Sequence, residues 1–286
     1  MRYEAPESVE KAVALLGAAT GETRVLAGGT DLLVQMRADI VDPELIVDIK
    51  KIAETRAVTE EKGGWRIGAA VTGAELKEHA RLKKAWPGVV EAANLIGSTQ
   101  IQGRATLGGN LCNGSPAADS VPALIAAAAV ATLAGPQGRR DLPVEDVMLG
   151  PRKLALKKGE IVVSFLLPPR PPRAADAYLR FIPRTEMDIA VVGAGVSLTL
   201  DGAGTISAAR VSLGAVAARV LLVSEAAQAI IGSRLDAAAQ QRLEAAARAA
   251  CRPIDDKRGT IEFRTDVAAV LARRTALIAL DRARTS

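Results

Sequence analysis

Two glycine-rich turns hold the residues of this sequence whose types and spacing best suit a chemical role. The first is AGGTDL, residues 27–32, and the second is ATLGGNLCNGSPAADS, residues 105–120. A Gly-Gly pair permits positive φ and removes the Cβ atoms that would keep a ligand away from the backbone. Backbone N–H groups at the start of a following helix then suit a phosphate. Thr30 or Asp31 is expected to cap the helix after the first turn.

The two turns together predict a dinucleotide site. TLGGN, Thr106 to Asn110, repeats the arrangement of the first turn, so each turn is expected to hold one of two phosphates from either side. Each turn alone could equally be a tight turn without a ligand, because glycine is common in turns. The presence of both, flanked by hydrogen-bonding side chains, favours binding.

Other kinds of site find little support. His79 is the only histidine, so a His-rich zinc site is excluded, and we expect this residue to lie on an exposed helix without a catalytic role. Neither GxxxxGK[ST] nor GxGxxG occurs, since GAGVSL at residues 193–198 lacks the third glycine. Cys112 and Cys251 do not have the spacing of a metal site, and they are too few for a disulfide framework or an iron–sulfur cluster.

Composition sets the limits on the class of protein. The chain has 286 residues, of which 49% are hydrophobic, and is long enough for two folded domains. Its 37 Lys and Arg residues are scattered and only 2% of the chain is aromatic, so nucleic-acid binding is not expected. No run of about 18 apolar residues predicts a transmembrane segment, and we expect a cytoplasmic protein without an export signal.

The elements that must position the glycine turns follow from apolar periodicity. A helix is expected in residues 7–19, a strand in 23–27 and a helix in 31–37. Short strands follow in 45–49, 65–71 and the apolar part of 123–135, together with helices in 74–82 and 88–97. Four prolines in residues 168–172 place a domain boundary near residue 170.

The part after the boundary reads as strands followed by helices. Residues 188–216 alternate apolar strand-like segments with glycine turns, GAG and DGAG, and the chain from residue 224 onward predicts two or three helices. This order indicates an α+β fold, with domains at residues 1–170 and 171–286.

Four segments resemble a known family. VLAGGTDLLVQMR, IGSTQIQGRATLGGNLCNGSPAADSVPAL, GPRKLALKKGEIV and RFIPRTEMDIAVVG are similar to the FAD-binding medium subunit of the molybdenum hydroxylases, which include carbon monoxide dehydrogenase and xanthine dehydrogenase. The similarity extends over nearly the whole chain. It implies a vanillyl-alcohol-oxidase-type FAD-binding domain made of two α+β subdomains, followed by a smaller C-terminal α+β domain of antiparallel sheet and helices.

The resemblance also implies which residues bind FAD. Asp119 and Asp188 match positions that hold polar groups of the cofactor, although Asp119 could instead cap the following helix and Asp188 could hold a turn. Cys112 is expected to be a small packing residue, and Tyr178 and Phe181 could shield the flavin ring or simply pack in the core. Many relatives have Arg-Asn where this chain has Gln102-Gly103, so a cofactor or partner contact there is not expected to carry over. The implied pyrophosphate loops are Ala27, Gly28, Gly29, Thr30 and Asp31, and Thr106, Leu107, Gly108, Gly109 and Asn110.

By the same resemblance, the chain works as one subunit of a larger enzyme. A large subunit with a molybdenum cofactor oxidises the substrate, and a small [2Fe-2S] subunit relays electrons to the FAD of this chain, which serves an external acceptor. A dimer of such heterotrimers is expected. A scaffold protein that keeps the fold without flavin, and a self-contained flavin oxidase, are the alternatives. Neither the substrate nor the acceptor can be read from the sequence.

Overall fold

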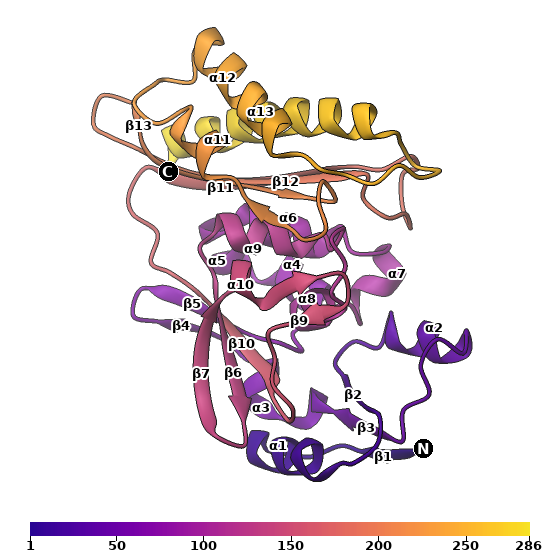
Figure 1. Cartoon of the computed structure of the whole chain (residues 1–286). Helices are drawn as coiled ribbons and strands as arrows, with labels where there is room; N and C mark the ends of the chain where they lie inside the picture. The colour runs from indigo at the N-terminus through magenta and orange to yellow at the C-terminus, as the bar shows by residue number, and fades with distance from the viewer.

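The computed structural model describes residues 1–286, and its first layer is a small parallel sheet (Figure 1). The central strand β3 pairs with β1 on one side and β2 on the other. Helix α1 connects β1 to β2 and buries Val9, Val13 and Leu16, as the periodicity predicted. The strand before the first glycine turn and the helix after it are also confirmed. The bounds are β1 (Arg2–Glu4), α1 (Val9–Ala18), β2 (Thr23–Leu26), α2 (Leu32–Arg37) and β3 (Leu45–Asp48).

The second layer is a five-stranded antiparallel sheet in the order β4-β5-β10-β6-β7, covered by short helices. Its strands are β4 (Val58–Glu61), β5 (Gly64–Gly68), β6 (Val130–Gly135), β7 (Gly138–Pro143) and β10 (Ile161–Leu167). A small hairpin pairs β8 (Met148–Gly150) with β9 (Lys153–Leu154). The helices are η1 (Ile49–Lys51), α3 (Ala53–Arg56), α4 (Gly73–Glu78), α5 (Ala80–Ala85), α6 (Pro87–Asn94), α7 (Thr99–Gln102), α8 (Leu107–Cys112), α9 (Ser120–Ala126) and α10 (Val144–Val147).

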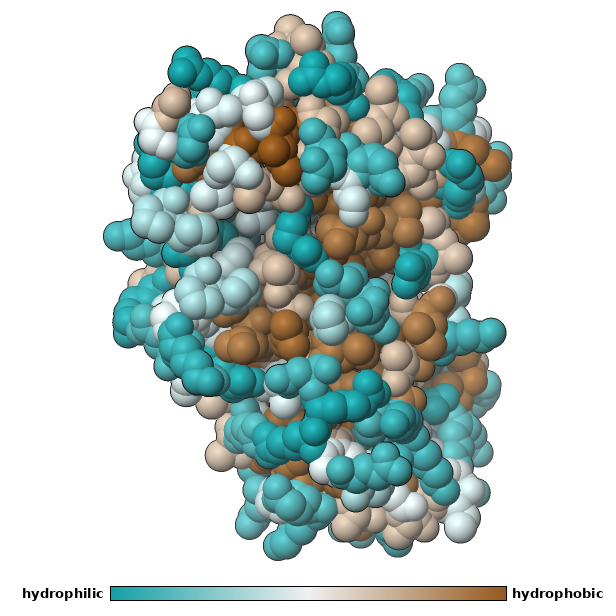
Figure 2. Space-filling view, turned by 60° about the vertical axis from the view of Figure 1, so that its left-hand side comes forward, coloured by the Kyte–Doolittle hydropathy of each residue, from teal (hydrophilic) through white to brown (hydrophobic).

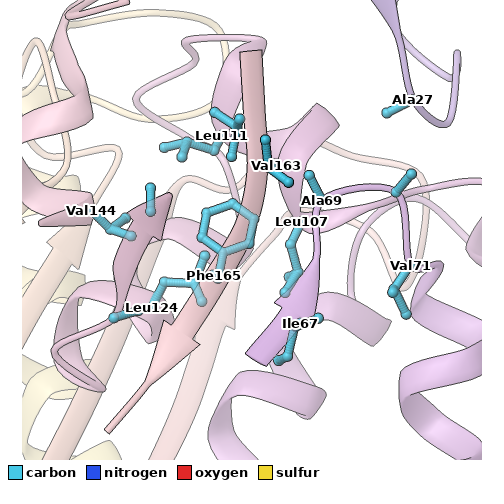
Figure 3. Packing of buried hydrophobic residues seen from close by; sticks show 14 of the residues in the cluster. Ala27, Ile67, Ala69, Val71, Leu107, Leu111, Leu124, Val144, Val163 and Phe165 are labelled. Atoms are coloured by element: carbon cyan, nitrogen blue, oxygen red, sulfur yellow. The ribbon is translucent and has the colours of Figure 1, made fainter. Parts of the chain in front are cut away.

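One hydrophobic core joins these two layers. Phe165 of β10 is fully buried and lies among Leu124, Val144 and Leu111, while Ile67 and Leu107 pack beside it (Figure 3). The second glycine turn therefore sits directly on the core through Leu107. Ala27 of the first turn belongs to the same core but lies at its edge (Figure 3).

The third layer is a four-stranded antiparallel sheet, β11-β12-β13-β14, with its own core of 27 buried residues. Helices α11 and α13 lie against one face, with α12 packed on both of them, and α6 and α9 of the second layer lie against the other face (Figure 1). The proline run lies in the connection between β10 and β11. The bounds are β11 (Ala174–Phe181), β12 (Val192–Leu200), β13 (Ile206–Gly214), β14 (Leu221–Leu222), α11 (Ser224–Gln228), α12 (Ala237–Ala250) and α13 (Ile261–Thr285).

Two local expectations are wrong. The helix predicted for residues 74–82 is broken at His79, whose Nδ1 accepts the Leu82 N–H at 3.2 Å and so starts a new helix. The His79 ring also packs edge-on against Trp65, with 5.2 Å between ring centroids. GAG, residues 193–195, lies inside strand β12 and not in a turn. A Cβ on Gly195 would lie 2.5 Å from the Pro122 carbonyl oxygen, so this glycine lets α9 pack closely on the sheet.

Candidate functional site: a cleft between two glycine loops

The two glycine turns meet at one cleft of about 460 Å³. Strand β2 and helix α8 bring the turns together, and residues of β10 and of the β8–β9 hairpin complete the wall. Half of the 28 lining residues are hydrophobic, which suits a ligand with both an apolar and a polar part. The predicted site residues in the lining are Ala27, Gly28, Gly29, Thr30, Asp31, Thr106, Gly108, Gly109 and Asn110.

The first loop offers a run of free backbone donors. None of the four N–H groups from Gly28 to Asp31 donates to an acceptor in the protein. Gly29 has φ +81°, a conformation that glycine adopts without strain. A Cβ on Gly28 would lie only 2.0 Å from the carbonyl oxygen of Arg104, so Gly28 is required for the close approach of the two loops. Consecutive free N–H groups of this kind form an anion-binding concavity.

The second loop does not repeat this arrangement, contrary to expectation. The Gly108 N–H donates to the Ala69 carbonyl at 3.1 Å, and the Asn110 N–H donates to the Thr106 carbonyl at 3.0 Å. The Gly109 N–H donates to Thr106 Oγ1 at 3.0 Å, so Thr106 caps α8. The N–H groups of Gly108, Gly109 and Asn110 are thus already used within the protein. A Cβ on Gly108 would lie 2.6 Å from the Ala69 carbonyl oxygen, whereas one on Gly109 would meet only Thr106 Oγ1, at 3.0 Å.

The side chain of Asn110 takes the capping role that was considered for Asp119. Its Oδ1 accepts the Ser120 backbone N–H at 3.0 Å and the Ser120 hydroxyl at 2.7 Å. The Asn110 Nδ2 group keeps no partner in the protein and is a free donor in the cleft lining. Asp119 makes no cap and instead turns toward β11, where it accepts from Tyr178 Oη at 3.2 Å and pairs with Arg180 at 2.8 Å.

The expected cap of α2 is also absent. Neither Thr30 nor Asp31 bonds a backbone N–H of this helix, because Asp31 Oδ1 accepts from Asn113 Nδ2 at 3.2 Å. Asn113 Oδ1 in turn accepts from Gln35 Nε2 at 3.0 Å. Desolvation by the surrounding protein raises the pKa of the Asp31 carboxyl above its ordinary value. With six residues and no cap, α2 contributes little to anion binding by its dipole.

Three predicted site residues lie outside the cleft lining. Leu107 is fully buried in the core behind the second loop. Asp119 is held by Tyr178 and Arg180, and burial raises its pKa to about 6 although Arg180 opposes this shift. Asp188 accepts the Ile189 N–H at 2.8 Å, and hydrogen bonds from Arg258 and its own backbone lower its pKa.

The residues whose roles the sequence left undecided lie partly in the core and partly at the surface. Tyr178 is buried, while Phe181 is partly exposed and meets Phe263 edge-on with 5.7 Å between ring centroids. Gln102 is buried and donates to the Asn94 carbonyl, so its side chain is occupied within the fold. Cys112, expected to be a packing residue, lines the cleft; the residue is exposed overall, whereas burial of its thiol raises the pKa to about 12.

Sequence reasoning missed Arg152, which also lines the cleft. It lies in GPRKLALKKGEIV, a segment quoted for its resemblance but given no role. Its N–H donates to the Gly114 carbonyl at 2.9 Å, and its φ is +57°, an uncommon conformation for arginine. The other charged lining residues have polar partners: Arg24 pairs with Glu22, Glu160 with Arg140, and Asp31 accepts from Asn113. The Arg152 guanidinium has no partner and is therefore available to a phosphate.

Two family models match the chain over separate ranges. The FAD-binding domain in molybdopterin dehydrogenase matches residues 1–170, and the CO dehydrogenase flavoprotein C-terminal domain matches residues 177–279. The carbon monoxide dehydrogenase medium chain of Hydrogenophaga pseudoflava is 33% identical over 272 residues, which cover 95% of this chain and 94% of the relative. The xanthine dehydrogenase FAD-binding subunit of Escherichia coli O157:H7 is 32% identical over 264 residues, or 92% and 90% of the two chains.

Solved structures match equally well. A chain of the cyanide-inactivated Cu,Mo-CO dehydrogenase superposes with a TM-score of 0.94 at 34% identity, covering 99% of this chain and 98% of that one. A chain of quinoline 2-oxidoreductase from Pseudomonas putida 86 gives a TM-score of 0.90 at 25% identity, with the same coverage. The α+β fold expected from the resemblance is confirmed. The chain therefore belongs to the FAD-binding flavoprotein family of the molybdopterin dehydrogenases.

Proposed function

We propose that this chain is the electron-exit subunit of a molybdenum hydroxylase. In this role it receives electrons from a [2Fe-2S] subunit and passes them to an external acceptor, while a large molybdenum subunit oxidises the substrate. The observation that carries the proposal is the run of four free N–H groups from Gly28 to Asp31 in a cleft of a flavoprotein-family fold. The scaffold alternative is not favoured, because the relatives of this chain are FAD-binding subunits of oxidising enzymes.

The residues of the cleft fit FAD. The free N–H groups of the first loop, the Arg152 guanidinium and the Asn110 amide would bind the pyrophosphate, and Thr106 would keep the second loop in place as the cap of α8. The apolar wall would receive uncharged parts of the cofactor; it includes Ile96, Leu154, Leu156, Ile161 and Val162. The predicted contacts of Leu107, Asp119 and Asp188 with FAD stay predictions that rest on the resemblance.

Bound FAD supplies the redox chemistry, since a flavin exchanges electrons singly or in pairs. The protein binds and orients the cofactor and sets its surroundings. With one histidine and two cysteines in the sequence, this chain has few metal ligands of its own, which supports placing the molybdenum and iron–sulfur centres on other subunits.

Exposed apolar side chains support contact with such subunits. Apolar groups reach the surface in several patches between polar ones on the face seen in Figure 2. Phe181 and Phe263, with exposed fractions of 37% and 40%, form an aromatic pair on the surface of the third layer. Exposed apolar surface of this kind marks protein–protein contacts when it is contiguous. No helix is both long enough and apolar enough to cross a membrane.

Affinity purification of the tagged chain from its native host tests the proposed role. We expect two further polypeptides, one with a molybdenum cofactor and one with [2Fe-2S] clusters, in equal amounts with this chain. The complex should oxidise its substrate with an external acceptor, and the isolated chain should not. Substrate oxidation by the isolated chain, or its purification alone from that host, would contradict the proposal.

A further inference from the structure

The hydrogen bonds that join the segment with the free N–H groups to distant parts of the protein all involve one side chain, that of Asn113. Within residues 28–43, every backbone hydrogen bond is local to the segment. The hydrogen bonds to distant residues are two, and both involve Asn113: Gln35 Nε2 donates to its Oδ1 at 3.0 Å, and its Nδ2 donates to Asp31 Oδ1 at 3.2 Å. Residues 28–43 take part in no ion pair.

Between the ends of this segment, where Gly28 lies close to Arg104 and Pro43 is buried, packing adds little to the attachment. Helix α2 has no buried residue, and Leu33 and Val34 are 53% and 63% exposed. In Figure 1, α2 projects from the body of the molecule at the side of the small parallel sheet. A helix with no buried side chain opens at a small fraction of the free energy needed for global unfolding. The two bonds of Asn113 are therefore a large part of what holds α2 and the first loop closed.

Asn113 itself is fixed to the second loop. It directly follows α8, and its N–H donates to the Gly109 carbonyl at 2.9 Å. Asp31, Gln35 and Asn113 all line the cleft. The side chain of Asn113 thus bridges the two glycine loops at the cleft, 82 and 78 residues from its two partners.

We propose that Asn113 is a positioning residue that latches the first glycine loop onto the second and thereby sets how fast FAD leaves the cleft. This inference rests on the proposed cofactor site. Asn113 acts through Asp31 and Gln35, which fix the position of the free N–H groups. Opening of the latch lets α2 and the first loop move away from the pyrophosphate, so the latch controls release more than association.

The test compares the purified wild-type chain with Asn113→Ala, Gln35→Ala and the double variant. Each chain is loaded with FAD and diluted, and free FAD is collected by ultrafiltration over time. Loss of two hydrogen bonds of about 1 kcal/mol each predicts roughly thirtyfold faster release for Asn113→Ala. Gln35→Ala should have a smaller effect, and the double variant should release FAD no faster than Asn113→Ala because the bond is already lost.

Two further measurements separate a latch from general loss of stability. The apo-protein melting temperature should be the same in all variants, and Gln241→Ala, an exposed glutamine of helix α12, should release FAD at the wild-type rate. Amide hydrogen exchange of residues 32–37 in the apo chain should be faster in Asn113→Ala. Unchanged exchange in these residues would overturn the latch, whether or not the wild-type chain binds FAD. Failure of the wild-type chain to bind FAD would count against the proposed site and not against the latch. Unchanged release in a chain that does bind FAD would also overturn it.

Discussion

Asp119 and Arg180 form an almost fully buried ion pair, with 2.8 Å between Oδ2 and Nη1 and side-chain exposures of 10% and 5%. The pair joins the N-terminus of α9 to strand β11, so it connects the second layer of the fold to the third. Tyr178 donates its hydroxyl to the same carboxylate at 3.2 Å. Because Asn110 caps α9 in place of Asp119, the carboxylate is free to make this connection.

Removal of one partner should cost much of the stability of the chain. Arg180→Met leaves Asp119 buried without its cation, and we expect the free energy of unfolding at pH 8 to fall by about 3–5 kcal/mol. Arg248→Met is the matched control, since Arg248 is 41% exposed and pairs with an exposed Asp266, and it should cost less than about 1 kcal/mol. Urea unfolding measures both. An equal loss of unfolding free energy in the two variants would show that the buried Asp119 pair contributes no more to stability than an exposed pair.

The same carboxyl should make stability depend on pH. The folded pKa of Asp119, about 6, lies above its ordinary value of 3.8, so the folded state binds more protons than the unfolded state between these values. Its contribution to stability is complete below about pH 4 and is lost as pH rises through 6. At ~1.4 kcal/mol per pKa unit, the loss is on the order of 2–3 kcal/mol.

Asp119→Asn isolates this contribution, because other carboxyls titrate alike in both proteins. We expect the stability of the wild type relative to Asp119→Asn to be greater at pH 4 than at pH 7 in urea unfolding. A difference that does not change with pH, or that grows toward pH 7, would rule out a raised pKa.

Gly109 and Gly28 should respond differently to a small side chain. Gly109→Ala adds a methyl at the cleft that meets only Thr106 Oγ1 and that favours the helix, so the apo protein should be as stable as the wild type. Its affinity for FAD should fall by about tenfold or more, because a loss of ~1.4 kcal/mol of binding free energy raises the dissociation constant tenfold. Gly28→Ala places a methyl against the Arg104 carbonyl and should lower the melting temperature itself. Calorimetry of the apo proteins and FAD titration separate the two effects.

Arg152 offers a test of phosphate binding without loss of folding. Arg152→Gly removes the guanidinium and relieves a positive φ of 57°, so the chain should be at least as stable as the wild type. The dissociation constant for FAD should rise by about tenfold, as for loss of one charge-assisted hydrogen bond of ~1.5 kcal/mol. The salt dependence of FAD binding should also weaken. Unchanged affinity at low salt would remove Arg152 from the site.

The sequence indicated most elements that carry the site, and the misses depend on particular side chains. Strand 23–27, the helix after it and the two glycine loops followed from apolar periodicity and glycine pairs. The break at His79 follows from its side chain capping the next helix, with its ring packed on Trp65, and the buried GAG of β12 depends on Pro122 in another layer.

The side-chain pairings at the site could be determined only from the folded structure. Asn110 caps α9 in place of Asp119, and the Asp31 carboxylate accepts a hydrogen bond from Asn113 and not from a helix N–H. Both pairings depend on which side chains the two loops bring together. Periodicity carries no information on such pairings. Arg152 was also beyond reach, because its lack of a partner is visible only when every charge near the cleft is placed.

The central claim is that this chain binds FAD in the cleft between its glycine loops. The most direct measurement is the absorption spectrum of the purified chain after incubation with FAD and gel filtration, with the cofactor released by heat and identified by chromatography. We expect one FAD per wild-type chain and clearly less in Gly109→Val, provided that the apo form of this variant is as stable as the wild type. A chain that stays colourless, alone and with its co-purifying subunits, would contradict it.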